Sequence, residues 1–173
     1  MLTIEQFGRT QRLALRLAGI ELRERHRELL CRKCRRGQIQ SVAHFDALLN
    51  AVEEGNPVAW RQLVGLVTTN FTGFFRHPRH FDVAAEHAFR VARQRGRARL
   101  WSAAAATGEE PYSLAIALIE AFGRDEPATT ILATDIDADA PAIAEAVGYN
   151  DRVLQELKPD RRERFFTEAA AGR

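Results

Sequence analysis

The first part of the chain has the hydrophobic spacing of helices. Apolar residues recur at intervals of three or four, and glycine, serine or proline stands where periodic stretches begin or end. We expect helices over four stretches: Ile4–Ala18, Glu21–Arg36, a segment capped by Ser41, and Pro57–Leu66. This pattern predicts a small all-α domain.

The pattern changes after a fifth helical stretch, Phe81–Arg95. Ala98–Ser102 is an apolar approach to a loop, and Thr129–Thr134 is short, apolar and β-branched, so both predict strands, the second of them buried. The periodic stretch Glu109–Phe122 between them predicts a helix, and a further helix is expected over Ala140–Ala146. Strand, helix and strand in this order indicate a βαβ unit.

The loop after the first predicted strand consists of small residues and ends in acids. Four alanines, Ala103–Ala106, are followed by Thr107-Gly108 and then by Glu109 and Glu110. Such a turn lets a ligand approach the backbone closely at the carboxyl edge of a parallel sheet. Carboxylates in the first turn of a helix suit the helix dipole, and they also attract a cationic ligand.

Asp135 directly follows the second predicted strand. An acid at this place in a βαβ unit commonly accepts hydrogen bonds from ribose hydroxyls, which indicates a nucleoside ligand. The loop lacks the GxGxxG and GxxxxGK[ST] patterns that hold pyrophosphate, so a cationic nucleoside without phosphates, such as S-adenosylmethionine (SAM), fits better. The alternative is that the alanine run is only a tight turn and that the acids, Asp137 included, only cap helices.

A third segment, residues 68–81, lies upstream of the first predicted strand. Its sequence, TTNFTGFFRHPRHF, combines an amide, phenylalanines and arginines. Together with LWSAAAATGEEPYSLA at 100–115 and ILATDID at 131–137, it resembles the CheR family of chemotaxis receptor methyltransferases in the order and spacing of the motifs. The stretch Arg152–Phe166 is also similar to the family, so the resemblance covers the chain from about Gly19 to its end.

The resemblance implies a fold and a reaction. The fold is an N-terminal all-α helical domain over residues 1–70, followed over residues 71–173 by the first part of an α/β Rossmann-like SAM-dependent methyltransferase domain. The reaction is O-methylation of a chemoreceptor glutamate with SAM as the methyl donor. An acceptor carboxylate with a reference pKa of about 4.3 is already ionised at neutral pH, so the enzyme supplies alignment rather than a strong general base.

The resemblance also assigns roles to five positions. Asn70, Thr72 and Arg76 are expected to contact the donor or the reacting centre, with Arg76 as the catalytic residue that orients the acceptor carboxylate. Glu110 is expected to meet the cationic end of the donor, and Asp135 is expected to bind its ribose hydroxyls. No metal site is expected.

Two residue pairs favour a structural interpretation. Phe74 and Phe75 are expected in the core, because aromatic side chains contribute much of the burial in protein cores. Cys31 and Cys34 form a single CxxC pattern within an arginine-rich helical stretch. Two thiolates are too few for a structural zinc site, and redox CxxC motifs follow strands, so we expect two reduced helix cysteines.

Positive charge is concentrated near the N-terminus. Residues 1–40 hold ten basic and four acidic side chains, whereas the whole chain carries a net charge of +2. The density peaks at Arg32, Lys33, Arg35 and Arg36. The resemblance implies that acidic methylation helices of a chemoreceptor face this basic stretch; a solvated helix face is the alternative. A nucleic-acid partner is not expected, since the stretch lacks interleaved aromatic residues.

Neither a membrane span nor a signal peptide is expected. No apolar run has the length of a transmembrane helix, and the N-terminus lacks the pattern of a secretory signal. A cytoplasmic location is the default expectation.

The chain ends soon after the second predicted strand. CheR proteins continue with further strands, an Asn-Val or Asn-Leu motif at the donor site and a tyrosine near the transferred methyl group. A two-stranded parallel piece leaves faces and edges uncovered, so we expect the isolated chain to bind SAM weakly and to have little or no transferase activity. Two alternatives stay open: a catalytically impaired, truncated CheR-like protein that binds receptors or signalling partners, and a nucleoside-dependent enzyme with another chemistry or acceptor.

Overall fold

The structure is a computed structural model that describes residues 2–36, 39, 41–146 and 148–167. The chain divides into two compact units, and each is described by itself. Unit 1 comprises Met1–Thr69 with Ile136–Ala138, and unit 2 comprises Asn70–Asp135 with Asp139–Arg173. Residues 168–173 of the second predicted domain lie outside the described ranges.

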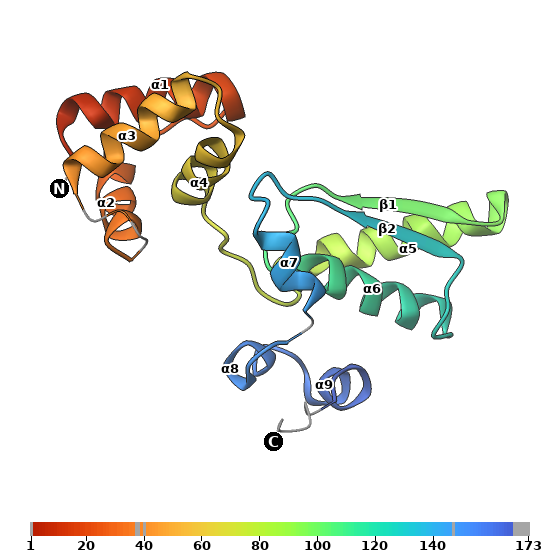
Figure 1. Cartoon of the computed structure of the whole chain (residues 1–173). Helices are drawn as coiled ribbons and strands as arrows, with labels where there is room; N and C mark the ends of the chain where they lie inside the picture. The colour runs from red at the N-terminus through yellow and green to blue at the C-terminus, as the bar shows by residue number, and fades with distance from the viewer. Residues whose placement is uncertain (1, 37–38, 40, 147, 168–173) are drawn as a thin grey trace. The chain divides into compact units, whose positions relative to one another are not determined.

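Unit 1 is helical (Figure 1). Its elements are α1 (Ile4–Ala18), the 3-10 turn η1 (Glu24–His26), α2 (Arg27–Arg36), α3 (Val42–Glu53) and α4 (Pro57–Val67). Side-chain oxygens of Thr3, Ser41 and Asn56 accept hydrogen bonds from the first backbone N–H groups of α1, α3 and α4. The structure confirms the predicted helices α1, α3 and α4. In each of them hydrophobic periodicity and side-chain capping agree.

The helix predicted over Glu21–Arg36 is wrong in its first part. Arg23 is extended, with φ −96° and ψ 163°, and α2 begins only at Arg27. Leu22 is buried in the core, and Gln11 Nε2 donates to the Leu22 carbonyl oxygen at 2.7 Å. The burial of Leu22 and the hydrogen bond to its carbonyl therefore outweigh the helix propensity of this part of the chain.

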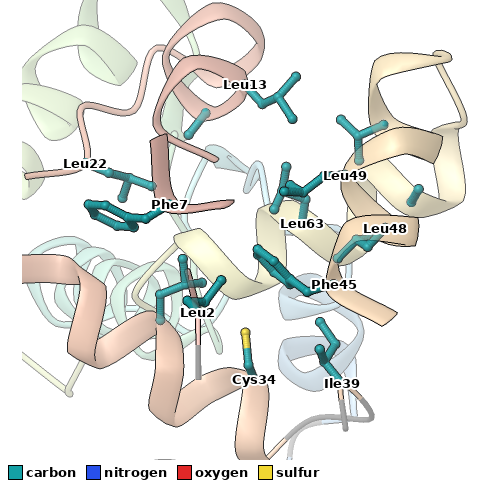
Figure 2. Packing of buried hydrophobic residues seen from close by; sticks show 14 residues of the cluster. Leu2, Phe7, Leu13, Leu22, Cys34, Ile39, Phe45, Leu48, Leu49 and Leu63 are labelled. Carbon is teal, nitrogen blue, oxygen red and sulfur yellow. The ribbon is translucent and has the colours of Figure 1, made fainter. Parts of the chain in front are cut away.

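The core of unit 1 is built from large apolar side chains (Figure 2). Phe45, Leu49 and Leu63 are 2%, 0% and 0% exposed. Cys34 of α2 lies at the edge of this cluster, and both cysteines of the described chain are free. The prediction of reduced helix cysteines is confirmed for this structure.

Unit 2 contains the βαβ arrangement predicted from the sequence. Its elements are α5 (Pro78–Arg95), β1 (Ala98–Ser102), α6 (Glu109–Phe122), β2 (Thr129–Ala133), α7 (Ala140–Glu145), α8 (Asp151–Leu154) and α9 (Pro159–Phe165). The two strands are parallel, with Trp101 opposite Leu132. The predicted bounds of β1 and α6 match the structure, whereas α5 begins three residues early because Pro78 occupies its first turn.

The sheet is covered on one face (Figure 1). Ala98, Leu100 and Ile131 belong to the apolar cluster formed with α5 and α6. Trp101 and Leu132 point to the other face and are 68% and 59% exposed. The prediction that the second strand is buried is therefore wrong: of the five residues of β2, two are half-buried and three are exposed.

The last described helix, α9, packs back onto α6. The Arg161 guanidinium pairs with both carboxylate oxygens of Glu120, at 2.8 and 2.7 Å. Arg164 donates to Asp125 at 2.9 Å. No helix in the described part of the chain is long and apolar enough to cross a membrane.

Candidate functional site

The small-residue loop is held against the end of β2. The Ala106 N–H donates to Asp135 Oδ2 at 2.8 Å, and the Ala105 N–H donates to the Thr134 carbonyl oxygen at 3.0 Å. Ala106 has φ +45°, a left-handed conformation that costs a non-glycine residue free energy. One oxygen of Asp135 thus stabilises the bent loop beside which a ligand would bind.

Glu110 lies in the first turn of α6 and contacts the start of the same loop. Its Oε1 accepts a hydrogen bond from Ser102 Oγ at 2.7 Å, and the residue is exposed. Its neighbour Glu109 is only 6% exposed and accepts from Thr107 Oγ1 at 2.6 Å. Of the two acids after the loop, Glu110 is therefore the one that remains accessible to a ligand.

Gly108 is the backbone joint between the loop and α6. It has φ +99°, and a Cβ placed on it would lie 2.6 Å from Tyr149 Oη and 2.7 Å from Ala144 Cβ. Tyr149 donates through the same hydroxyl to the Thr107 carbonyl oxygen at 2.8 Å, and burial raises the pKa of this phenol. The tyrosine hydroxyl is thereby kept protonated as a donor, and only glycine fits at the joint.

Arg76 is pre-oriented by its own segment. Its Nη1 donates to the Phe71 carbonyl oxygen at 2.8 Å, and its guanidinium lies 4.6 Å from the Phe71 ring centroid. Phe71 is 71% exposed, and Arg76 is exposed as well. Asn70 and Thr72, the other two predicted positions, flank Phe71 and are exposed and half-buried.

The backbone at the end of this segment, from Phe75 to His77, is strained, and it is braced from α6. Phe75 and His77 have φ +52° and +64°. The Phe75 N–H donates to Ser113 Oγ at 2.8 Å, and the fully buried Ser113 donates in turn to the Glu109 carbonyl oxygen at 2.6 Å. Arg161 of α9 stacks on the ring of Phe75, with its guanidinium 3.8 Å from the ring centroid.

Of the paired phenylalanines, Phe74 is buried as predicted, whereas Phe75 is half-buried and packs against the core. Phe74 is 4% exposed and packs edge-on against Tyr149 and Phe166, with ring centroids 5.0 and 5.2 Å away. Phe75 contacts Phe81 of α5 at 5.2 Å. These rings join the segment to α5, to Tyr149 and to Phe166 at the end of α9.

Several residues of this site were missed from the sequence. Ser113 has a weak signal, because it stands one helical turn after Glu109 and a serine there bonds back to the carbonyl of that turn. No sequence signal marks Phe71, Tyr149 or Arg161, because their contacts join segments far apart in the chain or depend on a side-chain rotamer.

The residues fit a cationic nucleoside. Ala103 and Ala104 are exposed, so the loop offers backbone with nothing larger than a methyl group over it. Asp135 and Glu110 place carboxylates at the two ends of the loop, through their contacts with Ala106 and Ser102. In the described chain no group of three or more His, Cys, Asp or Glu could hold a metal ion.

Comparison with known proteins decides the family. Residues 70–173 match the family described as CheR methyltransferase, SAM binding domain. The chain belongs to the CheR methyltransferase family. Its SAM-binding domain implies SAM as the cofactor, and the fold and cofactor predicted from the sequence are confirmed.

The CheR chain is also similar to curated relatives along most of its length. It is 37% identical to a chemotaxis protein methyltransferase of Salmonella typhimurium over 92% of the chain and 55% of that relative. It is 35% identical to the chemotaxis protein methyltransferase of Escherichia coli over 92% of the chain and 56% of that relative. It is 36% identical to chemotaxis protein methyltransferase 2 of Pseudomonas aeruginosa over 95% of the chain and 59% of that relative. The chain thus spans little more than half the length of these relatives.

Proposed function

We propose that this chain forms part of a SAM-dependent protein-glutamate O-methyltransferase that acts on chemoreceptors. The observation that carries the proposal is the brace between Asp135 and the Ala106 N–H, which joins the predicted ribose acid to the small-residue loop. The curated relatives are named chemotaxis protein methyltransferases, which supports the same reaction class.

The proposed roles of the side chains follow from their chemistry. SAM supplies a methyl group already activated by its sulfonium. Asp135 holds the ribose while one of its oxygens braces the loop, and Glu110 offers negative charge to the cationic end. Arg76 orients the acceptor carboxylate, and Phe71 limits the directions its guanidinium adopts. Asn70 and Thr72 contact the donor from the same segment.

The proposed partner is the acidic methylation region of a chemoreceptor in the cytoplasm. Arg32, Arg35 and Arg36 are exposed on α2 and supply complementary charge. Lys33 differs from them, since its ammonium is directed to backbone carbonyls of α4. The basic surface therefore consists of the arginines.

Calorimetric titration with SAM tests the donor site. We expect saturable binding weaker than about 1 µM to the 173-residue chain. Asp135→Ala should weaken binding at least about tenfold, through loss of the ribose contact and of the loop brace. The matched control is Asp82→Ala, an exposed acid on α5, which should bind as the original chain does. Equal affinity of both variants would refute the assignment.

A chimera tests the reaction. In the chimera, this chain would replace the matching part of the Salmonella relative. Transfer of a labelled methyl group to a cytoplasmic fragment of a receptor would then be measured. Arg76→Ala should lower kcat/KM about a hundredfold because the acceptor is no longer aligned, whereas Arg79→Ala, an exposed arginine of α5, should not. Receptor binding without any transfer would favour the binding-module alternative.

A further inference from the structure

Lys33 is the one basic residue of the 32–36 cluster that turns away from solvent. Its ammonium donates to the Gly65 carbonyl oxygen at 2.9 Å and also to the Thr68 carbonyl oxygen. Both acceptors lie at the C-terminal end of α4, where carbonyls have no partner within the helix. A lysine from a neighbouring helix therefore serves as the cap at this end.

Asp137 contributes the opposite charge. It is 6% exposed and belongs to Ile136–Ala138, the short segment that lies in unit 1. A Cβ placed on Gly65 would lie 4.0 Å from Asp137 Oδ1, so the carboxylate approaches the same end of α4. Burial lowers the pKa of Lys33, and the charge of Asp137 opposes that effect.

The cluster of Lys33, Asp137 and the two carbonyls stands beside the connections between the units. The chain enters unit 2 after Thr69 and returns to unit 1 after Asp135. Thr68 is two residues before Asn70, and Asp137 is two residues after Asp135. Lys33 therefore holds the end of α4, directly before the Asn70–Arg76 segment, by hydrogen bonds, and its positive charge attracts the carboxylate of Asp137, which follows Asp135 in the chain.

We propose that Lys33 is a positioning residue for the donor site, which anchors the entry to the Asn70–Arg76 segment and the exit from Asp135. The assignment of that site to SAM rests on the proposed function, whereas the anchoring does not. The backbone between Thr68 and Asn70, and between Asp135 and Asp137, transmits the restraint to the donor residues. Each stretch is so short that it has few conformations once its end is fixed.

Hydrogen exchange of the full chain without SAM tests the anchoring. We expect Lys33→Met to speed amide exchange about tenfold in residues 69–76 and 133–138, with no change in α5. Lys33→Arg should restore slow exchange, because it keeps the positive charge and several donors. Arg36→Met, an exposed neighbour on α2, is the matched control and should change neither segment.

Two results would overturn the proposal. One is unchanged exchange of both segments in Lys33→Met. The other is an equal rise throughout α1, α3 and α4, which would make Lys33 a general support of unit 1. SAM titration adds a separate readout, in which Lys33→Met should raise the Kd about tenfold. If the original chain binds no SAM, the proposed function fails while the exchange result still decides the anchoring.

Discussion

The three longest helices of unit 1 and the two longest helices of unit 2 start in different ways. In unit 1, Thr3, Ser41 and Asn56 cap α1, α3 and α4 through their side chains. In unit 2, α5 and α6 start at His77 and Gly108, both left-handed and without a side-chain cap. The local sequence stabilises the first group, whereas contacts with distant residues must stabilise the second.

Backbone strain follows the same division. The described non-glycine residues with positive φ are Phe75, His77 and Ala106, and all belong to unit 2 beside the predicted donor residues. Their restraints are Ser113 for Phe75 and Asp135 for Ala106. Strain that persists at such loops is typical of functional sites, where the surroundings fix an otherwise costly conformation.

The largest effect is expected at Gly108. Gly108→Ala should lower the free energy of unfolding of unit 2 by about 3–4 kcal/mol, because left-handed strain adds to the overlap with Tyr149 and Ala144. Gly96→Ala is the matched control, since Gly96 has φ +82° with no atom within 4 Å of its Cβ position. The control should lose only about 1–2 kcal/mol.

The measurement must separate the two units. The chain has two tryptophans, Trp60 in unit 1 and Trp101 in unit 2. Urea unfolding of Trp60→Phe and Trp101→Phe backgrounds, followed by fluorescence, reports each unit by itself. Equal losses in Gly108→Ala and Gly96→Ala would show that overlap at the joint contributes nothing.

The second expected effect lies in the core of unit 1. Leu49→Ala should destabilise unit 1 by about 3 kcal/mol, because the side chain is fully buried and truncation leaves a cavity. Exposed Leu15→Ala, on α1, is the control and should change stability by less than about 0.5 kcal/mol. A parallel loss in the Trp101 signal would mean that the two units unfold as one and would contradict their separate unfolding.

Local spacing in the sequence predicted helices better than it predicted the contacts of the site. Ser41 and the bounds of Glu109–Phe122 follow from local spacing and were confirmed. The brace of Phe75 by Ser113 joins residues 38 positions apart, and no local pattern predicts it. Lys33 shows the same limit: it was counted in the basic stretch that the resemblance places opposite a receptor, whereas its ammonium donates to carbonyl oxygens at the end of α4. The roles of Asn70, Thr72, Arg76, Glu110 and Asp135 stay predictions.

A smaller effect is expected at the brace of the strained segment. Ser113→Ala removes the acceptor of the Phe75 N–H in a fully buried place, so unit 2 should lose about 1–3 kcal/mol. Ser102→Ala is the control, because it removes a serine whose bond to Glu110 ends at an exposed carboxylate. SAM binding should fall in both variants, but only Ser113→Ala should speed amide exchange at residues 74–77. Slow exchange there would mean that the strain needs no restraint from α6.

The smallest effect concerns a surface ion pair of unit 1. Arg9 pairs with both oxygens of Glu53, at 3.2 and 2.7 Å, and this hydrogen bond lowers the pKa of Glu53 below the ordinary 4.5. The pair stabilises unit 1 above pH 4.5, and that contribution is lost as the pH falls through the lowered pKa. Because Glu53 is 44% exposed, its size should be about 0.5–1 kcal/mol.

The pH dependence of one substitution isolates this contribution. Glu53→Gln should be less stable than the original chain at pH 7, and the difference should vanish at low pH, where the glutamate is protonated and neutral like glutamine. Glu54→Gln, at the exposed next position, should differ from the original chain by less at every pH. The Trp101 signal should not change in either variant, since the pair belongs to unit 1. A difference that persists at low pH would assign the effect to packing of the side chain rather than to its charge.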